Sequence, residues 1–111
     1  MKVLGINDDV TTCECCGKTN LKKTVVLATE TGEVHYGVNC AARALLPKVK
    51  GAAKSIETQA TAMALANKWL AAGHTPEVVR QGIWNRFGYP CGIQDGHLII
   101  GIRGEVGSIK V

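Results

Sequence analysis

Three of the five cysteines in this 111-residue sequence, Cys13, Cys15 and Cys16, lie within four positions. The spacing Cys13-x-x-Cys16-Gly17 is typical of a zinc knuckle, in which two thiolates on one tight turn bind the same ion. Gly17 allows the backbone to turn beneath the sulfur atoms, because glycine tolerates positive φ. Zinc favours four tetrahedral ligands, so two thiolates are not enough and the chain must supply others.

The segment that follows predicts a hairpin leading back to these cysteines. Residues 24–29, TVVLAT, are apolar and β-branched and predict a strand, and residues 33–38, EVHYGV, predict its partner after a glycine turn. Asn39 is a favourable N-cap, which predicts a helix with Cys40 in its first turn. A helix N-terminus stabilises a thiolate through its dipole and its free amide groups. Pro47 is expected to end this helix.

The order of knuckle, hairpin and helical cysteine resembles the treble-clef zinc fold. Within that class, residues 12–46 resemble small phage-type proteins with the pattern C-x-C-C-G-K followed by Y-G-x-x-C-A-x-R. The resemblance implies that Cys13, Cys16 and Cys40 bind a structural Zn²⁺. It also implies an origin in a phage or mobile element. The residues that carry the match are Cys13, Cys16, Gly17, Tyr36, Gly37, Cys40 and Arg43.

The fourth ligand is left open by the sequence. Treble clefs usually place it three or four residues after the helical cysteine, where this chain has Arg43 and Ala44, neither of which binds zinc. Cys91 is the leading candidate, because a fold that brings it back would tie the C-terminal region to the zinc module. His35 and Cys15 are the alternatives, together with water or a knuckle that binds no metal.

The rest of the chain predicts an α+β domain. Residues 1–6 predict a short strand, and residues 52–72 predict an Ala-rich helix whose stripe of Ile56, Ala60 and Met63 is interrupted by Asn67. A second helix is expected after Thr75 as N-cap and Pro76 at the first helical position, and it ends at Gly88. The tail predicts a β-hairpin that turns at Asp95-Gly96, with residues 98–102 as a strand. We expect one domain, 1–111, made of a zinc module (12–46), a helical pair (52–88) and a β-rich tail (90–111).

Composition excludes several classes of protein. No apolar run of about 18 residues exists to cross a membrane, and the N-terminal segment lacks the apolar stretch of a signal peptide. An odd number of cysteines without export does not favour a disulfide framework. We therefore expect a cytoplasmic protein whose thiols stay reduced.

The basic residues suggest a partner for the zinc module. The net charge is +4, and no acidic residue lies between Glu33 and Glu57. A positive patch formed there would attract phosphates without reading their sequence. The leading hypothesis is thus a small non-enzymatic protein that binds nucleic acid, although solvated lysines that keep the helix soluble would give the same pattern. The candidate nucleic-acid-binding residues are Lys22, Lys23, Arg43, Lys48 and Lys50.

Two other function classes compete with this hypothesis. The first is an adaptor or inhibitor that binds a protein. Trp69 and Trp84 are expected in the core, but an exposed Trp would mark a protein interface, and the Ala-rich helix also allows a homodimer. The second is a nuclease-like treble-clef enzyme, for which His35 is well placed, although the helix after the hairpin has no histidine. No catalytic triad, phosphate loop or HExxH motif occurs, so we expect no enzymatic activity.

Overall fold

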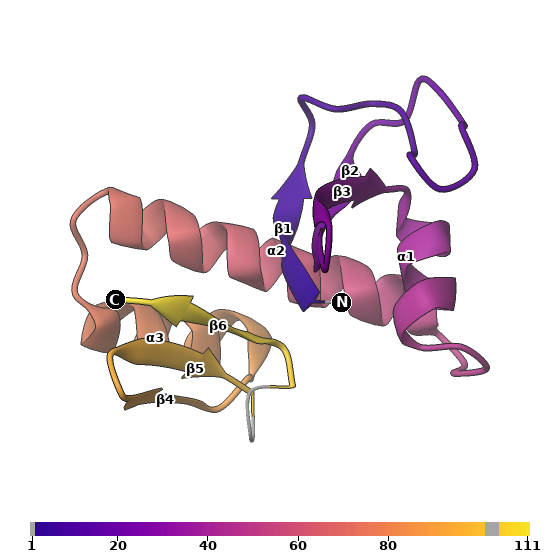
Figure 1. Cartoon of the computed structure of the whole chain (residues 1–111). Coiled ribbons are helices and arrows are strands. Elements are labelled where there is room, and N and C mark those ends of the chain that lie inside the picture. The colour runs from indigo at the N-terminus through magenta and orange to yellow at the C-terminus, as the bar shows by residue number, and fades with distance from the viewer. Residues whose placement is uncertain (1, 102–104) are drawn as a thin grey trace. The chain divides into compact units, whose positions relative to one another are not determined.

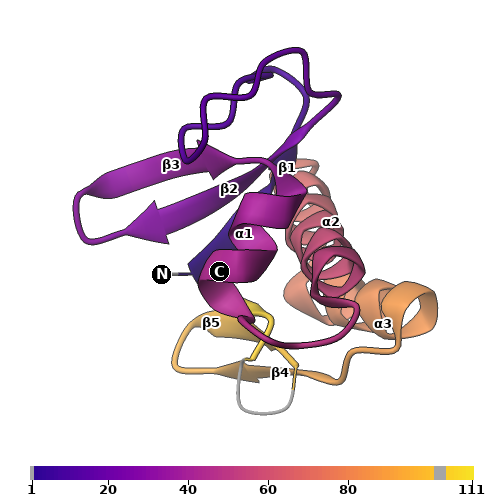
Figure 2. The ribbon, with the colours of Figure 1, turned by 90° about the vertical axis from the view of Figure 1, so that its right-hand side faces the viewer.

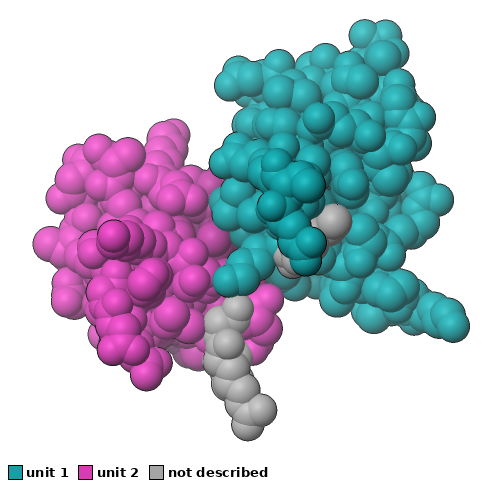
Figure 3. Space-filling model, viewed as in Figure 1, with its two compact units in different colours: residues 1–61 teal, residues 62–111 magenta. Residues whose placement is uncertain are grey.

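The computed structural model describes residues 2–101 and 105–111. It combines three helices with two antiparallel three-stranded sheets within the described part of the chain, which confirms the predicted α+β class (Figure 1). Two compact units are present, residues 1–61 and 62–111, and the boundary falls within the longest helix (Figure 3). The elements are β1 (Lys2–Asn7), β2 (Thr24–Thr29), β3 (Gly32–Tyr36), α1 (Val38–Leu45), α2 (Ala52–Ala71), α3 (Pro76–Phe87), β4 (Cys91–Gln94), β5 (His97–Ile100) and β6 (Gly107–Lys110).

The first unit is built on a sheet in the order β1-β2-β3. The central strand β2 has the bounds predicted from its β-branched residues, and it buries Val25 and Leu27 completely. Thr24 is also fully buried, and its hydroxyl donates to the carbonyl of Val10 at 2.9 Å, so the polar group does not remain unpaired. The strand β1, predicted as a separate element, pairs with β2 and extends the hairpin to three strands.

Helix α1 packs against β2 and β3 (Figure 2). The prediction that Asn39 caps this helix is wrong, because the chain turns into the helix earlier. Gly37 is the N-cap, with φ −58° and ψ 155°, and its carbonyl accepts the first helical hydrogen bond from Ala41 at 2.9 Å. The strand β3 accordingly ends at Tyr36 rather than at Val38. Pro47 follows the end of the helix as expected.

The second unit contains the C-terminal half of α2, the helix α3 and the sheet β4-β5-β6. Helix α3 begins and ends as predicted. The Thr75 side chain accepts from the N–H of Val78, Pro76 occupies the first turn, and Gly88 closes the helix in the left-handed conformation. The helix packs against β4 and β5 and buries Val79 and Ile83.

The C-terminal sheet is larger than the hairpin expected there. Asp95 and Gly96 have φ of 52° and 74° and form the predicted turn between β4 and β5. β5 starts at His97 and ends at Ile100, whereas the predicted strand ran to Ile102, which lies outside the described residues. β6 pairs with β5 as a third strand. Its short, glycine-containing sequence GSIK gave too weak a period to predict it as a separate strand.

The two tryptophans differ in burial, and the prediction of a core role is wrong for Trp84. Trp69 is half-buried and its ring lies against Gly82 of α3. Trp84 keeps 52% of its surface exposed because it points away from the helix face that buries Val79 and Ile83. Helices α2 and α3 therefore make contact through the Trp69 ring and Gly82 rather than through the two tryptophan rings.

The contact between Trp69 and Gly82 leads to a prediction of stability. Replacing glycine by alanine inside a helix usually stabilises it by about 1 kcal/mol. At Gly82, however, an added Cβ would lie 2.7 Å from the Trp69 ring, and forcing the two apart costs about 1–3 kcal/mol. We expect Gly82→Ala to lower the free energy of unfolding measured in urea and to change Trp fluorescence. Gly92→Ala, where the added Cβ meets nothing within 4 Å, is the control, and a stabilised Gly82→Ala would contradict the prediction.

Candidate metal centre

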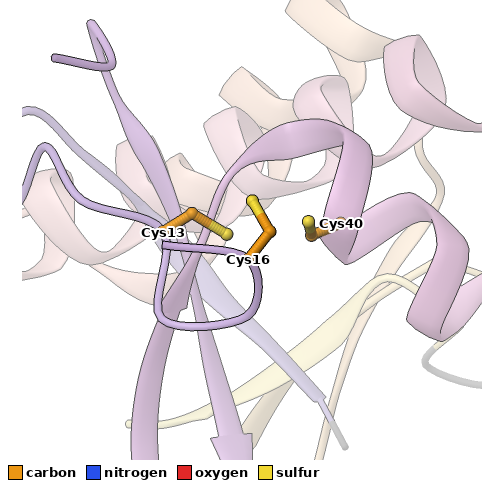
Figure 4. A group of neighbouring side chains, drawn as sticks. All are labelled: Cys13, Cys16 and Cys40. Carbon is orange, nitrogen blue, oxygen red and sulfur yellow. The ribbon is translucent and has the colours of Figure 1, made fainter. Parts of the chain in front are cut away.

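The structure brings together three of the predicted ligands. The sulfur atoms of Cys13, Cys16 and Cys40 all lie within 4.8 Å of one another (Figure 4). Cys13 and Cys16 come from the loop between β1 and β2, and Cys40 comes from the first turn of α1. Around a tetrahedral zinc with bonds of about 2.3 Å, sulfur atoms lie about 3.8 Å apart, which is within the limit of 4.8 Å that the three sulfur atoms satisfy. Three thiolates that converge from two segments are suited to metal binding.

The loop around Cys13 is a tight turn closed by backbone hydrogen bonds. The N–H of Gly17 donates to the carbonyl of Cys13 at 2.8 Å, and the N–H of Cys13 donates to the carbonyl of Lys18 at 2.9 Å. Gly17 has φ of 79°, so its conformation is one that glycine adopts without strain. The prediction that this glycine turns the backbone beneath the sulfur atoms is confirmed.

The Cys13 sulfur is buried but surrounded by hydrogen-bond donors. Burial alone raises the pKa of a thiol, but the backbone N–H groups of Gly37, Cys16 and Cys15 donate to this sulfur and outweigh that effect. A hydrogen bond with the Cys40 thiol adds to them, and together they lower the pKa of Cys13 from 9.0 to about 7. Cys13 is therefore prepared to act as a thiolate at neutral pH.

Cys40 behaves in the opposite way. Burial raises the pKa of its thiol to about 12, with further contributions from hydrogen bonds to the thiols of Cys16, Cys13 and Cys15 and from the negative charge on Cys13. The guanidinium of Arg43, one turn further along α1, donates to the Cys40 sulfur at 3.6 Å. A cationic side chain thus lies beside the Cys40 sulfur, where it would favour the thiolate form once the proton is lost.

The knuckle is fastened to the end of β3 by Glu14. Its backbone N–H donates to the carbonyl of His35 at 2.8 Å, and its carboxylate accepts from the N–H of His35. These two hydrogen bonds connect the loop to the strand that leads into α1. They therefore tie the loop that carries Cys13 to the hairpin that leads to Cys40.

A concavity of about 310 Å³ opens beside the three cysteines. Its lining includes four cationic side chains, those of Lys18, Lys22, Lys23 and Arg43. Lys23 also forms an ion pair with Glu57 at 2.8 Å, and because both side chains are 44% exposed, this pair contributes little to stability. Lys48 and Lys50, predicted to join the same basic surface, are exposed in the connection to α2 and are not among the lining residues.

The three candidates for the fourth ligand lie in different surroundings. Cys91 begins β4 in the second unit, where its thiol donates to the carbonyl of Tyr89 at 3.4 Å and burial raises its pKa. His35 is half-buried on β3, and its Nδ1 has no hydrogen-bond partner. Cys15 is exposed, and its thiol interacts with Cys40. None of the three belongs to the group of mutually close sulfur atoms, so the fourth ligand stays a prediction.

Two contributions to this site have only weak signals in the sequence. Gly37 was part of the matching pattern, but its role is structural: its N–H donates to Cys13, and its carbonyl accepts the first hydrogen bond of α1. A Cβ there would lie 3.3 Å from Leu21 and 3.8 Å from the Cys13 sulfur, so a glycine allows this close approach. Nothing in the sequence indicated that Glu14 would bond to His35, because an acidic residue between cysteines in a loop is usually a solvated side chain.

Comparison with known proteins finds no family model that matches the chain, no similar curated protein and no similar solved structure. The resemblance to treble-clef proteins of phage type therefore stays a prediction. None of the helices in the described part of the chain has both the length and the apolar character needed to cross a lipid bilayer.

The pKa values of Cys13 and Cys40 predict how zinc binding depends on pH. Zinc binds thiolates, so binding must displace any proton that a ligand still carries. We expect the affinity to fall as the pH drops through about 7, where Cys13 gains its proton, and proton release to continue above that pH because Cys40 has a pKa of about 12. Calorimetry in buffers of different ionisation enthalpy measures the number of protons released. Zinc binding at about pH 8 without proton release would contradict the prediction.

Proposed function

We propose that this chain is a small non-enzymatic zinc-binding protein in which the metal is structural and organises a treble-clef-like module. The observation that carries the proposal is the convergence of the Cys13, Cys16 and Cys40 sulfur atoms within 4.8 Å. Zinc is favoured over harder ions because the close ligands are thiolates. The N–H groups directed at Cys13 are the kind of support that orients a metal ligand.

A structural role for the metal follows from the segments that it would join. An ion held by these three residues ties the loop before β2 to the first turn of α1, which are otherwise connected through the whole β2-β3 hairpin. Closing such a site adds binding free energy to folding, because the site does not exist in the unfolded chain. The zinc would thus fix the position of the helix against the sheet.

We further propose that the concavity beside the metal binds the phosphate groups of nucleic acid. The support is the four cationic side chains that line it, none of which has an acidic neighbour within two positions in the sequence. Phosphates are attracted to such a surface by charge, without readout of base sequence. A phage or mobile-element origin, suggested by the sequence resemblance, is compatible with a role of this kind.

A protein-binding adaptor is the second candidate, and Trp84 favours it. This side chain is 52% exposed on α3, and Val78 on the same helix is 55% exposed. Exposed tryptophan is frequent among the residues that dominate protein interfaces. An adaptor would bind its partner with little dependence on salt and would lose affinity on Trp84→Ala.

A nuclease-like activity is the third candidate, and it depends on His35. Its Nδ1 has no hydrogen-bond partner, but α1, with the sequence VNCAARAL, offers no histidine to hold a catalytic metal. We propose that the protein does not cleave nucleic acid. Metal-dependent cleavage that is lost in His35→Ala would overturn this proposal.

Removal of the metal should act mainly on the first unit. We expect a chelator to increase amide hydrogen exchange in β2, β3 and α1, because the loop and the helix lose their common anchor. Exchange in α3 and in the sheet β4-β5-β6 should change less, since the three close sulfur atoms belong to residues 1–61. Equal loss of protection in both units, or in neither, would argue against a structural metal confined to the first unit.

Binding to nucleic acid should be weak, independent of sequence and sensitive to salt. With a single-stranded oligonucleotide as probe, we expect the affinity to fall about 10-fold or more between about 50 and 200 mM salt. The double variant Lys18→Gln with Lys22→Gln should bind more weakly and show a smaller salt slope. Lys68→Gln with Lys110→Gln, which removes the same two charges from α2 and β6, is the matched control. Binding that both variants leave unchanged would exclude this surface.

A further inference from the structure

A second concavity, of about 230 Å³, is lined only by residues of the second unit. We call it the α3 concavity, and its lining residues are Arg80, Gln81, Trp84, Pro90 and Cys91. From the exposed indole ring and the unpaired guanidinium that line it together, we infer that it binds one base of a single-stranded nucleic acid and a neighbouring phosphate. The inference rests on the proposed function and deepens it, because it adds a contact with a base to the contacts with phosphates.

The ring of Trp84 is available for stacking. Helix α3 buries Val79 and Ile83, whereas Trp84, the residue that follows Ile83, is 52% exposed. The one pair of stacked rings that the described residues contain joins Phe87 to Tyr89, so the indole has no aromatic partner there. Bases stack on an exposed ring of this kind whatever their identity, because every base has a π-face.

Arg80 supplies the charge for a phosphate beside this ring. It is exposed and precedes Trp84 by four residues on α3, and residues at this spacing are neighbours on a helix surface. The one ion pair among residues 2–101 and 105–111 lies in the first unit, so no carboxylate neutralises Arg80 within that part of the chain. The segment 78–94 contains no acidic residue. An exposed guanidinium that is not paired with a carboxylate can bind a phosphate through two parallel hydrogen bonds.

The size and the remaining lining of the α3 concavity suit a group as small as one base. Sites for drug-sized molecules have volumes of about 300–1,000 Å³, and this concavity is smaller. Pro90 adds a second apolar surface to that of Trp84, and Gln81 adds a side-chain amide. The amide nitrogen of Gln81 donates to Asn85 at 3.0 Å, which leaves the amide oxygen to accept from an amino group on the edge of a base.

A protein partner fits this surface less well than a base does. Where a tryptophan dominates a protein interface, other contacts around it exclude water. Val78, the other exposed apolar residue of α3, precedes Trp84 by six positions and therefore lies about 120° away around the helix. Val78 lines a separate concavity, together with Trp69, His74 and Gly82. The inference thus assigns Trp84 to nucleic acid rather than to the protein partner of an adaptor.

Titration of the zinc-loaded full chain with a single-stranded oligonucleotide of mixed sequence tests the stack. We expect binding to quench Trp fluorescence, and Trp84→Ala to weaken binding about 10-fold, which is the effect of losing one stacked base. Trp84→Phe should keep most of the affinity, because a phenyl ring still stacks, but it should lose the quenching. Quenching that persists in Trp84→Phe comes from Trp69 and would overturn the inference. Val78→Ala, a change at an exposed residue of α3 outside the lining, is the control.

The salt dependence of the same titration tests the phosphate contact. Arg80→Gln should lower the slope of log affinity against log salt by about 1, whereas Arg80→Lys should keep the slope, because the charge remains. Arg86→Gln removes the same charge from the last turn of α3, outside the lining, and is the matched control. An equal loss of slope in Arg80→Gln and Arg86→Gln would show a diffuse effect of charge and would contradict the assignment of a phosphate to Arg80.

Three further probes identify the chemistry that the α3 concavity recognises. An abasic oligonucleotide keeps the phosphates and lacks the bases, so it should bind the original protein and Trp84→Ala equally well. A nucleoside monophosphate should displace the strand only at much higher concentration, because a single phosphate releases fewer counterions. Displacement at equal concentration would make free nucleotides the ligand and overturn the assignment to a strand. Polyglutamate that binds more tightly than the oligonucleotide, and loses this binding in Trp84→Ala, would make the partner a protein.

The outcomes separate this inference from the proposed function. If the variant Lys18→Gln with Lys22→Gln weakens binding and neither Trp84→Ala nor Arg80→Gln does, the inference fails while the proposed phosphate surface stands. If the oligonucleotide does not bind the original protein, both fail. Trp84 and Arg80 are exposed, so their variants should stay folded, which circular dichroism checks. Weaker binding by folded Trp84→Ala and Arg80→Gln, with Val78→Ala and Arg86→Gln unchanged, supports the inference.

Discussion

The sulfur atom of Cys13 is the point on which the first unit depends, because three parts of the chain meet there. Two of its backbone donors, from Cys15 and Cys16, belong to its own loop, and the third, Gly37, joins β3 to α1. These contacts connect the loop to the junction between the hairpin and the helix. These bonds also favour its negative charge, so the interaction that orders the backbone is the one that prepares a metal ligand.

The same arrangement decides how charge is distributed around the site. Each thiolate brought to the cluster adds negative charge, and the cations that line the concavity offset it more strongly the closer they lie. Arg43 donates to the Cys40 sulfur at 3.6 Å. Its guanidinium is therefore engaged at the cysteine cluster and is less available to bind a phosphate. The lysines are left to attract phosphate, which explains why the proposed nucleic-acid surface rests on Lys18 and Lys22 more than on Arg43.

Residue patterns predicted the elements well and the junctions poorly. The strand 24–29, the caps at Thr75 and Gly88 and the turn at Asp95-Gly96 follow from local chemistry, and the structure agrees with each. The start of α1 was misplaced because Asn39 is a good cap by composition, whereas Gly37 is chosen by its contact with Cys13, which is distant in sequence. The prediction that Trp84 lies in the core was wrong for a similar reason. A hydrophobic residue in a helix does not by itself reveal which face of the helix is buried. The three converging cysteines could be predicted because knuckle spacing and hairpin length together fix where Cys40 arrives.

The distribution of aromatic residues gives a physical reason for a metal in one unit only. Four of the five aromatic residues, Trp69, Trp84, Phe87 and Tyr89, belong to residues 62–111, and Tyr36 alone belongs to residues 1–61. The buried residues of the first unit include alanines at positions 41, 42 and 60 beside Val25, Leu27 and Ile56. A unit of this size with few large apolar side chains gains little from burial and needs a cross-link of another kind. Four of the five cysteines lie in this same unit, so the proposed metal would supply such a cross-link there.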